Sequence, residues 1–111
     1  MELDYKITLG VLLDDEKVPE KLSWEASAQE QPPQEVKAFL LSLFEHESRD
    51  TLKIDLWTKD MQVQEMDRFF YQTLRGLADT YQRATRNEPI GKAMEDFAQF
   101  FGEKTGIIPV S

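Results

Sequence analysis

The spacing of apolar residues changes along this chain, and that change restricts the fold more than any other feature. In residues 5–13, apolar side chains recur at every second position, which is the period of a half-buried β-strand. In residues 63–81, they recur at every third or fourth position, which is the period of an amphipathic helix. A chain with both periods is predicted to be α+β.

The amino-terminal part predicts a β-hairpin and then a helix. Residues 5–13 and 18–26 both alternate, and the polar residues 14–17 between them suit a hairpin loop. Pro19 cannot donate to a strand ladder, so the second strand is expected at an edge or to begin after it. After a loop at residues 27–34, helical spacing predicts a first helix with the stripe Val36, Phe39, Leu40, Leu43 and Phe44.

A third strand and two more helices follow. Leu52, Ile54 and Leu56 alternate with polar residues and predict the strand. Thr58 or Asp60 can cap the next helix, because either side chain can accept a hydrogen bond from a free backbone N–H. The predicted buried stripe of that helix is Val63, Met66, Phe70, Leu74, Leu77 and Tyr81, and Gly76 beside it could admit a neighbouring helix.

The last helix has clear signals at both ends. Asn87 is the expected N-cap, and Pro89 falls in the first turn. Gly102 and Gly106 are expected to end the helix, and residues 107–111 form an apolar tail. Such a tail can pack on its own domain or add to the sheet edge of another protein.

The predicted element order is therefore ββαβαα, within one domain that covers residues 1–111. The simplest sheet has three antiparallel strands in the order 2-1-3. Three helices are expected to pack on one face of this sheet, and the other face is polar. The residues expected on the covered face are Ile7, Leu9, Trp24 and Ile54.

Composition excludes several classes of function. The chain has no cysteine, which rules out disulfides, thiolate nucleophiles and cysteine–zinc sites. Its net charge of −8 disfavours binding to nucleic acid or to an anionic membrane. No stretch approaches the ~20 apolar residues of a membrane span, and the first residues lack the pattern of a signal peptide. We expect a cytoplasmic protein.

No catalytic or metal-binding constellation is visible. The single histidine, His46, lies between two glutamates near the expected end of the first helix and has no partner at a meaningful spacing. The acidic residues 14–16 lack the spacing of a calcium loop. No phosphate-binding or nucleophile motif occurs. The sequence predicts a protein that is not an enzyme and has no cofactor and no metal.

Trp57 is the most informative surface candidate. Alternation places it on the polar face, at the end of the third strand, so it is either a lid over the core or a contact for a partner. The N–H groups expected at the adjoining helix start would suit an acidic partner group. The predicted partner-binding residues are Lys53, Asp55, Trp57, Thr58, Lys59 and Asp60.

The edges of the predicted sheet favour a monomer over a homodimer. Pro19, Lys21 and Glu25 protect the second strand against pairing with another chain. The third strand carries Lys53 and is otherwise open, so pairing through that edge is the expected route to a dimer.

Three segments, "KVPEKLSWEA", "LKIDLWTKDM" and "FFYQTLRGLADTYQRAT", together with "MEDFAQFFGEKTGI", resemble the gliding motility protein GldC family of Bacteroidetes. The resemblance covers nearly the whole chain, apart from the final "IIPVS". It implies a role in surface gliding, which is linked to the type IX secretion system.

The family resemblance implies an accessory protein that acts through protein–protein interaction, and it brings no catalytic residues. It makes the gliding lipoprotein GldB a plausible partner, although a lipoprotein lies outside the cytoplasm and this chain shows no export signal. An alternative is a secretion-associated chaperone or carrier that holds a client or a small apolar ligand, which needs a broad exposed apolar face.

Overall fold

A computed structural model describes residues 4–28 and 31–110 of the chain. The chain forms two compact units, Met1–Met61 and Gln62–Ser111. We call them the strand unit and the helix unit, and we describe each by itself. The described part of the strand unit contains β1 (Ile7–Leu13), β2 (Pro19–Ala26), β3 (Gln34–Val36), β4 (Ala38–Phe44) and β5 (Thr51–Trp57).

The predicted hairpin of the first two strands is confirmed. β1 and β2 pair antiparallel, with Leu9 opposite Trp24 and Val11 opposite Leu22. The Leu22 side chain is fully buried. A carboxylate oxygen of Asp14 closes the loop by accepting hydrogen bonds from the N–H groups of Glu16 and Val18, at 2.8 and 3.0 Å.

The helix predicted from Val36 to Phe44 is wrong, because this segment forms β3 and β4. Its apolar residues fit both periods: positions 36, 40 and 43 suit a helix, whereas positions 39, 41 and 43 suit a strand. The antiparallel partner decides between them, since Phe39, Leu41 and Leu43 lie opposite Leu56, Ile54 and Leu52 of β5.

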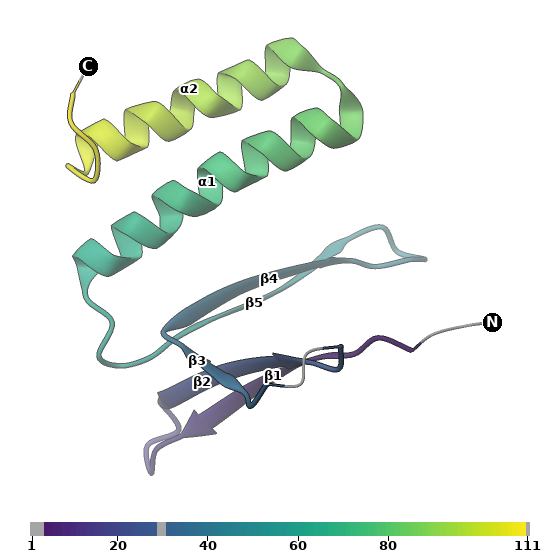
Figure 1. The fold of residues 1–111 in the computed structure, drawn as a ribbon, viewed down its shortest axis with the longest axis vertical. Coiled ribbons are helices and arrows are strands. Elements are labelled where there is room, and N and C mark those ends of the chain that lie inside the picture. Colours follow the sequence, from purple (N-terminus) through teal and green to yellow (C-terminus); the bar gives the residue numbers. More distant parts are fainter. Residues whose placement is uncertain (1–3, 29–30, 111) are drawn as a thin grey trace. The chain divides into compact units, whose positions relative to one another are not determined.

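The predicted sheet order 2-1-3 and the fold with three helices on one face of a single sheet are also wrong. The described strands form two antiparallel sheets, β1-β2-β3 and β4-β5. Once β4 is a strand, a short loop brings it beside β5, and neighbours in sequence pair more readily than distant strands. The two sheets are joined at Lys37, between β3 and β4, and they diverge from that point (Figure 1). At this junction the N–H of Thr58 donates to the carbonyl oxygen of Lys37 at 2.8 Å.

The described part of the helix unit contains two helices, α1 (Val63–Thr85) and α2 (Glu88–Lys104). The predicted caps Thr58 and Asp60 are wrong for α1, whose N-cap is Gln62. Its N–H donates to Oε1 of Glu65 at 3.0 Å, as in a capping box. The predicted cap of α2 is confirmed, because Oδ1 of Asn87 accepts from the N–H of Ile90 at 3.3 Å.

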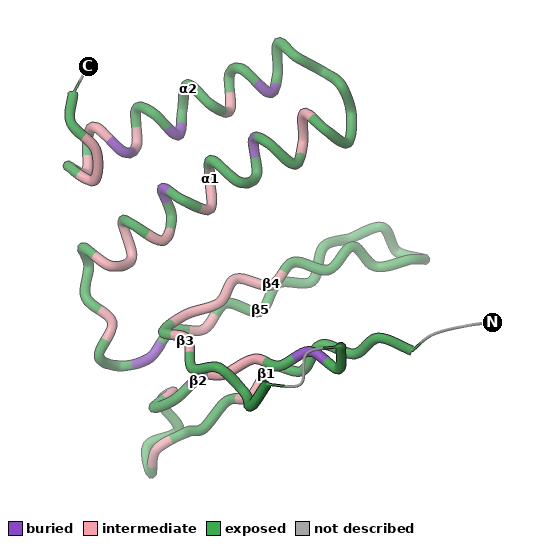
Figure 2. The backbone as a smooth tube through the Cα atoms, viewed as in Figure 1, coloured by how far each residue is buried: buried purple, intermediate pink, exposed green. Residues whose placement is uncertain are grey.

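Small residues bring α1 and α2 together. Apart from Tyr71 on α1, the buried positions are small: Ala78 on α1 and Gly91, Ala98 and Gly102 on α2. The buried positions lie on the sides of the two helices that face each other (Figure 2). The buried side of α1 differs from the predicted stripe: Phe70, which was predicted to be buried, is 38% exposed. The predicted role of Gly76 is wrong as well, since a Cβ atom there would meet nothing within 4 Å.

The carboxyl-terminal segment packs on the helix unit. The N–H groups of Ile107 and Ile108 donate to the carbonyl oxygen of Gly102 at 2.9 and 3.1 Å. Both isoleucines are half-buried, whereas Val110 is exposed; the last residue of the predicted tail, Ser111, lies outside the described residues. In the described part of the chain, neither helix is long and apolar enough to cross a membrane.

Candidate partner-binding surface

The β4–β5 hairpin has two different faces. Directly opposed residues of an antiparallel pair point to the same side, so the register of β4 and β5 assigns each residue to one face. One side, which we call the apolar face, consists of Phe39, Leu41, Leu43, Leu52, Ile54 and Leu56. The other side, which we call the tryptophan face, consists of Ala38, Leu40, Ser42, Phe44, Thr51, Lys53, Asp55 and Trp57.

Three of the predicted partner-binding residues lie together on the tryptophan face. Nζ of Lys53 is 3.4 Å from Oδ1 of Asp55, so their charges are already paired within the strand. Trp57 is 52% exposed and lies opposite Ala38, whose small side chain cannot cover an indole. These three residues form an accessible patch that combines apolar area with charge.

The next predicted residue, Thr58, is buried and tethers the end of β5. Thr58 is 3% exposed, and its hydroxyl donates to Oδ1 of Asp60 at 2.5 Å. This hydrogen bond lowers the pKa of the Asp60 carboxyl group. Thr58 and Asp60 therefore stabilise the turn that follows β5, and Thr58 offers almost no surface to a partner.

Lys59 holds this turn against the β1–β2 loop. Its Nζ lies 3.0 Å from Oδ2 of Asp14 and 3.9 Å from Oε1 of Glu20. The hydrogen bond to Asp14 raises the pKa of Lys59. The pKa of Asp14 is lowered, first by the hydrogen bond from the N–H of Val18 and then by Lys59. Lys59 thus supports the position of Trp57.

One argument for the predicted site fails. Free N–H groups were expected beside Trp57, at the start of a helix capped by Thr58 or Asp60. The first helix begins instead at Val63, after the Gln62 cap, so these donors do not adjoin Trp57 along the chain. The attraction for an acidic partner group therefore has no basis at this position.

The sequence did not predict the other exposed apolar residues of the β4–β5 hairpin. Phe44 is 72% exposed and lies at the opposite end of the tryptophan face from Trp57. Leu43, Leu52 and Ile54 are exposed on the apolar face. The signal that could have found them is the period of two at positions 39, 41 and 43, which the helical pattern of the same segment concealed.

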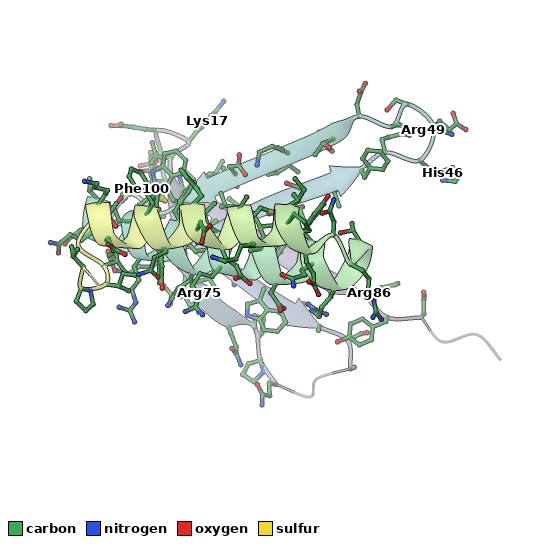
Figure 3. All side chains as sticks on the ribbon, turned by 90° about the horizontal axis from the view of Figure 1, so that it is seen from above. Lys17, His46, Arg49, Arg75, Arg86 and Phe100 are labelled. Atoms are coloured by element: carbon green, nitrogen blue, oxygen red, sulfur yellow. The ribbon has the colours of Figure 1, made fainter. Side chains whose placement is uncertain are left out.

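His46 lies in the loop between β4 and β5, and not near a helix end as predicted. Figure 3 labels it with Arg49 at the tip of the hairpin. The Glu45 carboxylate organises the loop by accepting hydrogen bonds from the N–H groups of Glu47 and Ser48, each at 2.7 Å. These hydrogen bonds lower the pKa of the Glu45 carboxyl group, and the bond from the N–H of Ser48 has the larger effect.

Charge is distributed unevenly between the two units. Residues 1–61 contain 14 acidic and 7 basic residues, for a formal net charge of −7, whereas residues 62–111 contain 7 acidic and 6 basic residues, for −1. The candidate surface therefore belongs to a strongly acidic unit. Such a field attracts basic partners and repels acidic ones.

The helix unit offers a polar groove between α1 and α2. Its volume is about 730 Å³, and its lining includes Arg75, Asp79 and Glu95. The Arg75 guanidinium lies 5.9 Å from the centre of the Tyr71 ring. Among the described residues, no group of three or more His, Cys, Asp or Glu side chains could hold a metal ion.

Comparison with known proteins gives a family. Residues 19–107 match the family described as gliding motility-associated protein GldC-like. No curated protein matches the chain, and no solved structure matches it. The match includes all of β2 to α2, and with them the hairpin that carries Trp57. The chain belongs to the GldC-like family of gliding motility-associated proteins.

Proposed function

We propose that this chain is a non-enzymatic accessory protein of the bacterial gliding machinery, and that it binds another protein through the tryptophan face of the β4–β5 hairpin. The observation that carries the proposal is the exposed Trp57 beside the Lys53–Asp55 ion pair. A half-exposed tryptophan flanked by charges has the character of an interface hot spot.

The contact residues are a subset of those predicted from the sequence. Lys53, Asp55 and Trp57 form the contact patch, and exposed Phe44 extends it along the same face. Thr58, Lys59 and Asp60 hold the end of the strand in place through the bonds described above. Because residues 1–61 carry a net charge of −7, the partner surface is expected to be basic around an apolar centre.

A role without catalysis agrees with the electrostatics of the carboxyl groups. A general acid that works near neutral pH needs a raised carboxyl pKa. The structure instead lowers the pKa of Asp14, Glu45 and Asp60, in each case mainly through hydrogen bonds to the ionised form. These groups serve as acceptors that organise loops.

The first experiment is an affinity pull-down from a gliding bacterium with wild-type and Trp57→Ala proteins. We expect the variant to lose a specific partner while its free energy of unfolding changes by less than about 1 kcal/mol, because an exposed side chain gives up little burial. A loss of several kcal/mol would identify Trp57 as a lid on the core and would contradict the binding role.

Trp24→Ala is the matched control. Trp24 is half-buried on β2, opposite Leu9 and Gln34. We expect this variant to be destabilised by about 2 kcal/mol or more, yet to retain the partner at a temperature where it stays folded. Equal loss of the partner in both variants would show that the pull-down reports general damage.

A chaperone or carrier role is the second candidate, and the apolar face favours it. Leu43, Leu52 and Ile54 are exposed side by side there, which is the kind of surface that the sequence did not lead us to expect. Salt separates the two roles: raising it from about 0.1 to about 0.5 M should weaken binding to a basic partner, but should not weaken apolar client binding.

The gliding lipoprotein GldB is our proposed first partner to test, and a link to the type IX secretion system is part of the same proposal. The family assignment supports a place in the gliding machinery. Because the strand unit is acidic, we expect its partner to present a basic surface. Purified GldB should bind the wild-type chain and not Trp57→Ala. We also propose a cytoplasmic location, which cell fractionation tests.

A further inference from the structure

The β4–β5 sheet has only two strands, and the outer edge of β5 is not paired with a strand of the described chain. β4 pairs with β5 along all seven residues of each strand, and the sheet order ends there. An isolated two-stranded ribbon is marginally stable in water, and it normally needs a third strand or packing against another element. An open edge also presents a row of unpaired N–H and C=O groups.

We propose that β5 pairs antiparallel with β5 of a second copy of this chain, with Ile54 opposite the partner subunit's Ile54. The resulting sheet has four strands in the order β4, β5, partner β5, partner β4. Edge pairing uses backbone groups in the plane of the sheet and leaves both faces uncovered. The dimer therefore does not cover the tryptophan face, although Lys53 and Asp55 of that face also set its register.

The charges of β5 select this register. When the strands are centred on Ile54, Lys53 of each copy lies opposite the partner subunit's Asp55, and two favourable cross-strand pairs form. Centring on Lys53 or on Asp55 would place two like charges directly opposite each other, which is destabilising. Within one copy these two side chains are already 3.4 Å apart, so the dimer would contain a cluster of four alternating charges.

The remaining positions of β5 agree with the same register. In this register Leu52 would lie opposite the partner subunit's Leu56. Just after Trp57, the N–H of Lys59 donates to the carbonyl oxygen of Pro19 at 3.1 Å, so the proposed pairing is centred on Ile54 and away from the strand end that adjoins β2. The apolar faces of both copies then lie on one side of the sheet and the tryptophan faces on the other, because opposed residues share a side. β4 lacks this selectivity, since its sequence AFLLSLF contains no charge.

The inference departs from the monomer expected from the sequence. That expectation rested on Pro19, Lys21 and Glu25 as protection of a sheet edge. β2 instead lies between β1 and β3 and is not an edge, so these residues do not protect the outer edge of β5.

Light scattering of the full chain at micromolar concentration tests the dimer. We expect a mass near twice 12.9 kDa for the wild type. Lys53→Asp or Asp55→Lys places like charges opposite each other and should raise the dissociation constant by roughly tenfold or more. Lys21→Asp, the same charge change on exposed Lys21 of β2, is the matched control and should remain dimeric.

Charge complementation makes the test specific. In the proposed register, an equimolar mixture of the Lys53→Asp and Asp55→Lys proteins pairs an all-acidic β5 with an all-basic β5, so we expect heterodimers. The double variant K53D/D55K should regain the homodimer. A wild-type mass of 12.9 kDa, or variants that dimerise as well as the wild type, would overturn the proposal.

Cysteine cross-linking reports the register directly, because the chain has no native cysteine. Ile54→Cys lies opposite itself in the dimer, about 4.5–5.5 Å between Cα atoms, within the range that a disulfide spans. Thr51→Cys would be about 20 Å from its own copy and should not cross-link. Cross-linking through Leu41→Cys, at the centre of β4, would show that the other edge pairs and would contradict the assignment.

Discussion

Gly76 and Gly102 differ in the space that surrounds a Cβ atom. At Gly102, an added Cβ would lie 2.6 Å from the Tyr71 ring and 2.9 Å from the Ile108 side chain, whereas at Gly76 it would meet nothing within 4 Å. The first glycine is therefore required by packing between α1, α2 and the carboxyl-terminal segment. The second weakens α1, because glycine in a helix interior loses more conformational freedom than alanine.

The two alanine substitutions should have opposite effects. We expect Gly102→Ala to lower the free energy of unfolding by about 1–3 kcal/mol through overpacking. Gly76→Ala should raise it by about 0.5–1 kcal/mol through helix propensity. Thermal unfolding followed by circular dichroism at the helical band measures both. Effects of the same sign would mean that the approach of α1 to α2 is described wrongly.

Trp57 shows how a single residue depends on the end of its strand. Its exposure follows from the small Ala38 opposite it, and its position follows from Thr58, whose N–H is bonded to the Lys37 carbonyl oxygen. The neighbouring Lys59 is tied to Asp14. An exposed aromatic on a fixed backbone binds with little loss of conformational freedom, which favours recognition.

At the scale of elements, two loops of the strand unit are organised by carboxylates. Asp14 accepts two backbone N–H bonds in the β1–β2 loop, and Glu45 accepts two in the β4–β5 loop. Both pKa values are lowered in the folded chain from the ordinary values of 3.8 and 4.5. A carboxyl group with a depressed folded pKa stabilises the fold above its unfolded pKa, and that contribution is lost as the pH falls through the folded value.

We therefore expect the free energy of unfolding to be nearly constant from pH 7 to about pH 5 and to fall below that, as these carboxylates become protonated. Glu45→Gln removes an ionised acceptor and should flatten the decline in the acid range. Glu47→Gln in the same loop leaves the bonds to the Glu45 carboxylate intact and is the control. Urea unfolding between pH 3 and pH 7 gives the comparison, and an unchanged acid slope in Glu45→Gln would contradict this role.

At the scale of the whole molecule, tryptophan fluorescence reports on the strand unit and helical circular dichroism reports on the helix unit. Both tryptophans, Trp24 and Trp57, lie in residues 1–61, and the described helices lie in residues 62–111. The sequence predicts one domain for residues 1–111. Urea unfolding followed by tryptophan fluorescence and by helical circular dichroism should then give coincident transitions, as two-state behaviour requires. Two separate midpoints would contradict the single-domain prediction.

Charge is the other property of the whole chain that bears on function. The net charge of −8 comes almost entirely from residues 1–61. General repulsion between copies would oppose self-association, so the proposed dimer depends on the local complementarity of Lys53 and Asp55. We attribute specificity to these two residues and the main contribution to affinity to the backbone edge.

Several elements could be predicted from the sequence because local signals sufficed. The β1–β2 hairpin follows from two alternating runs across a short polar loop, and α2 follows from Asn87 and Pro89 at its start. The family could also be recognised from the sequence, through characteristic segments that fall in β2, β5 and α1. Of the candidate site, Trp57 and the Lys53–Asp55 pair could be placed on one strand face from alternation alone.

Only the tertiary structure decided the rest. Residues 38–44 are almost wholly apolar and fit either period, so their conformation depends on β5 as a partner and not on a local signal. That one outcome changed the sheet order and created the two-stranded hairpin with its exposed faces. The start of α1 at Val63, after the Gln62 cap, was likewise decided by the non-local bonds of Thr58 to Lys37 and of Lys59 to Asp14, which keep residues 58–60 outside the helix. Spacing along a sequence reports a local period, whereas strand pairing depends on residues that only folding brings together.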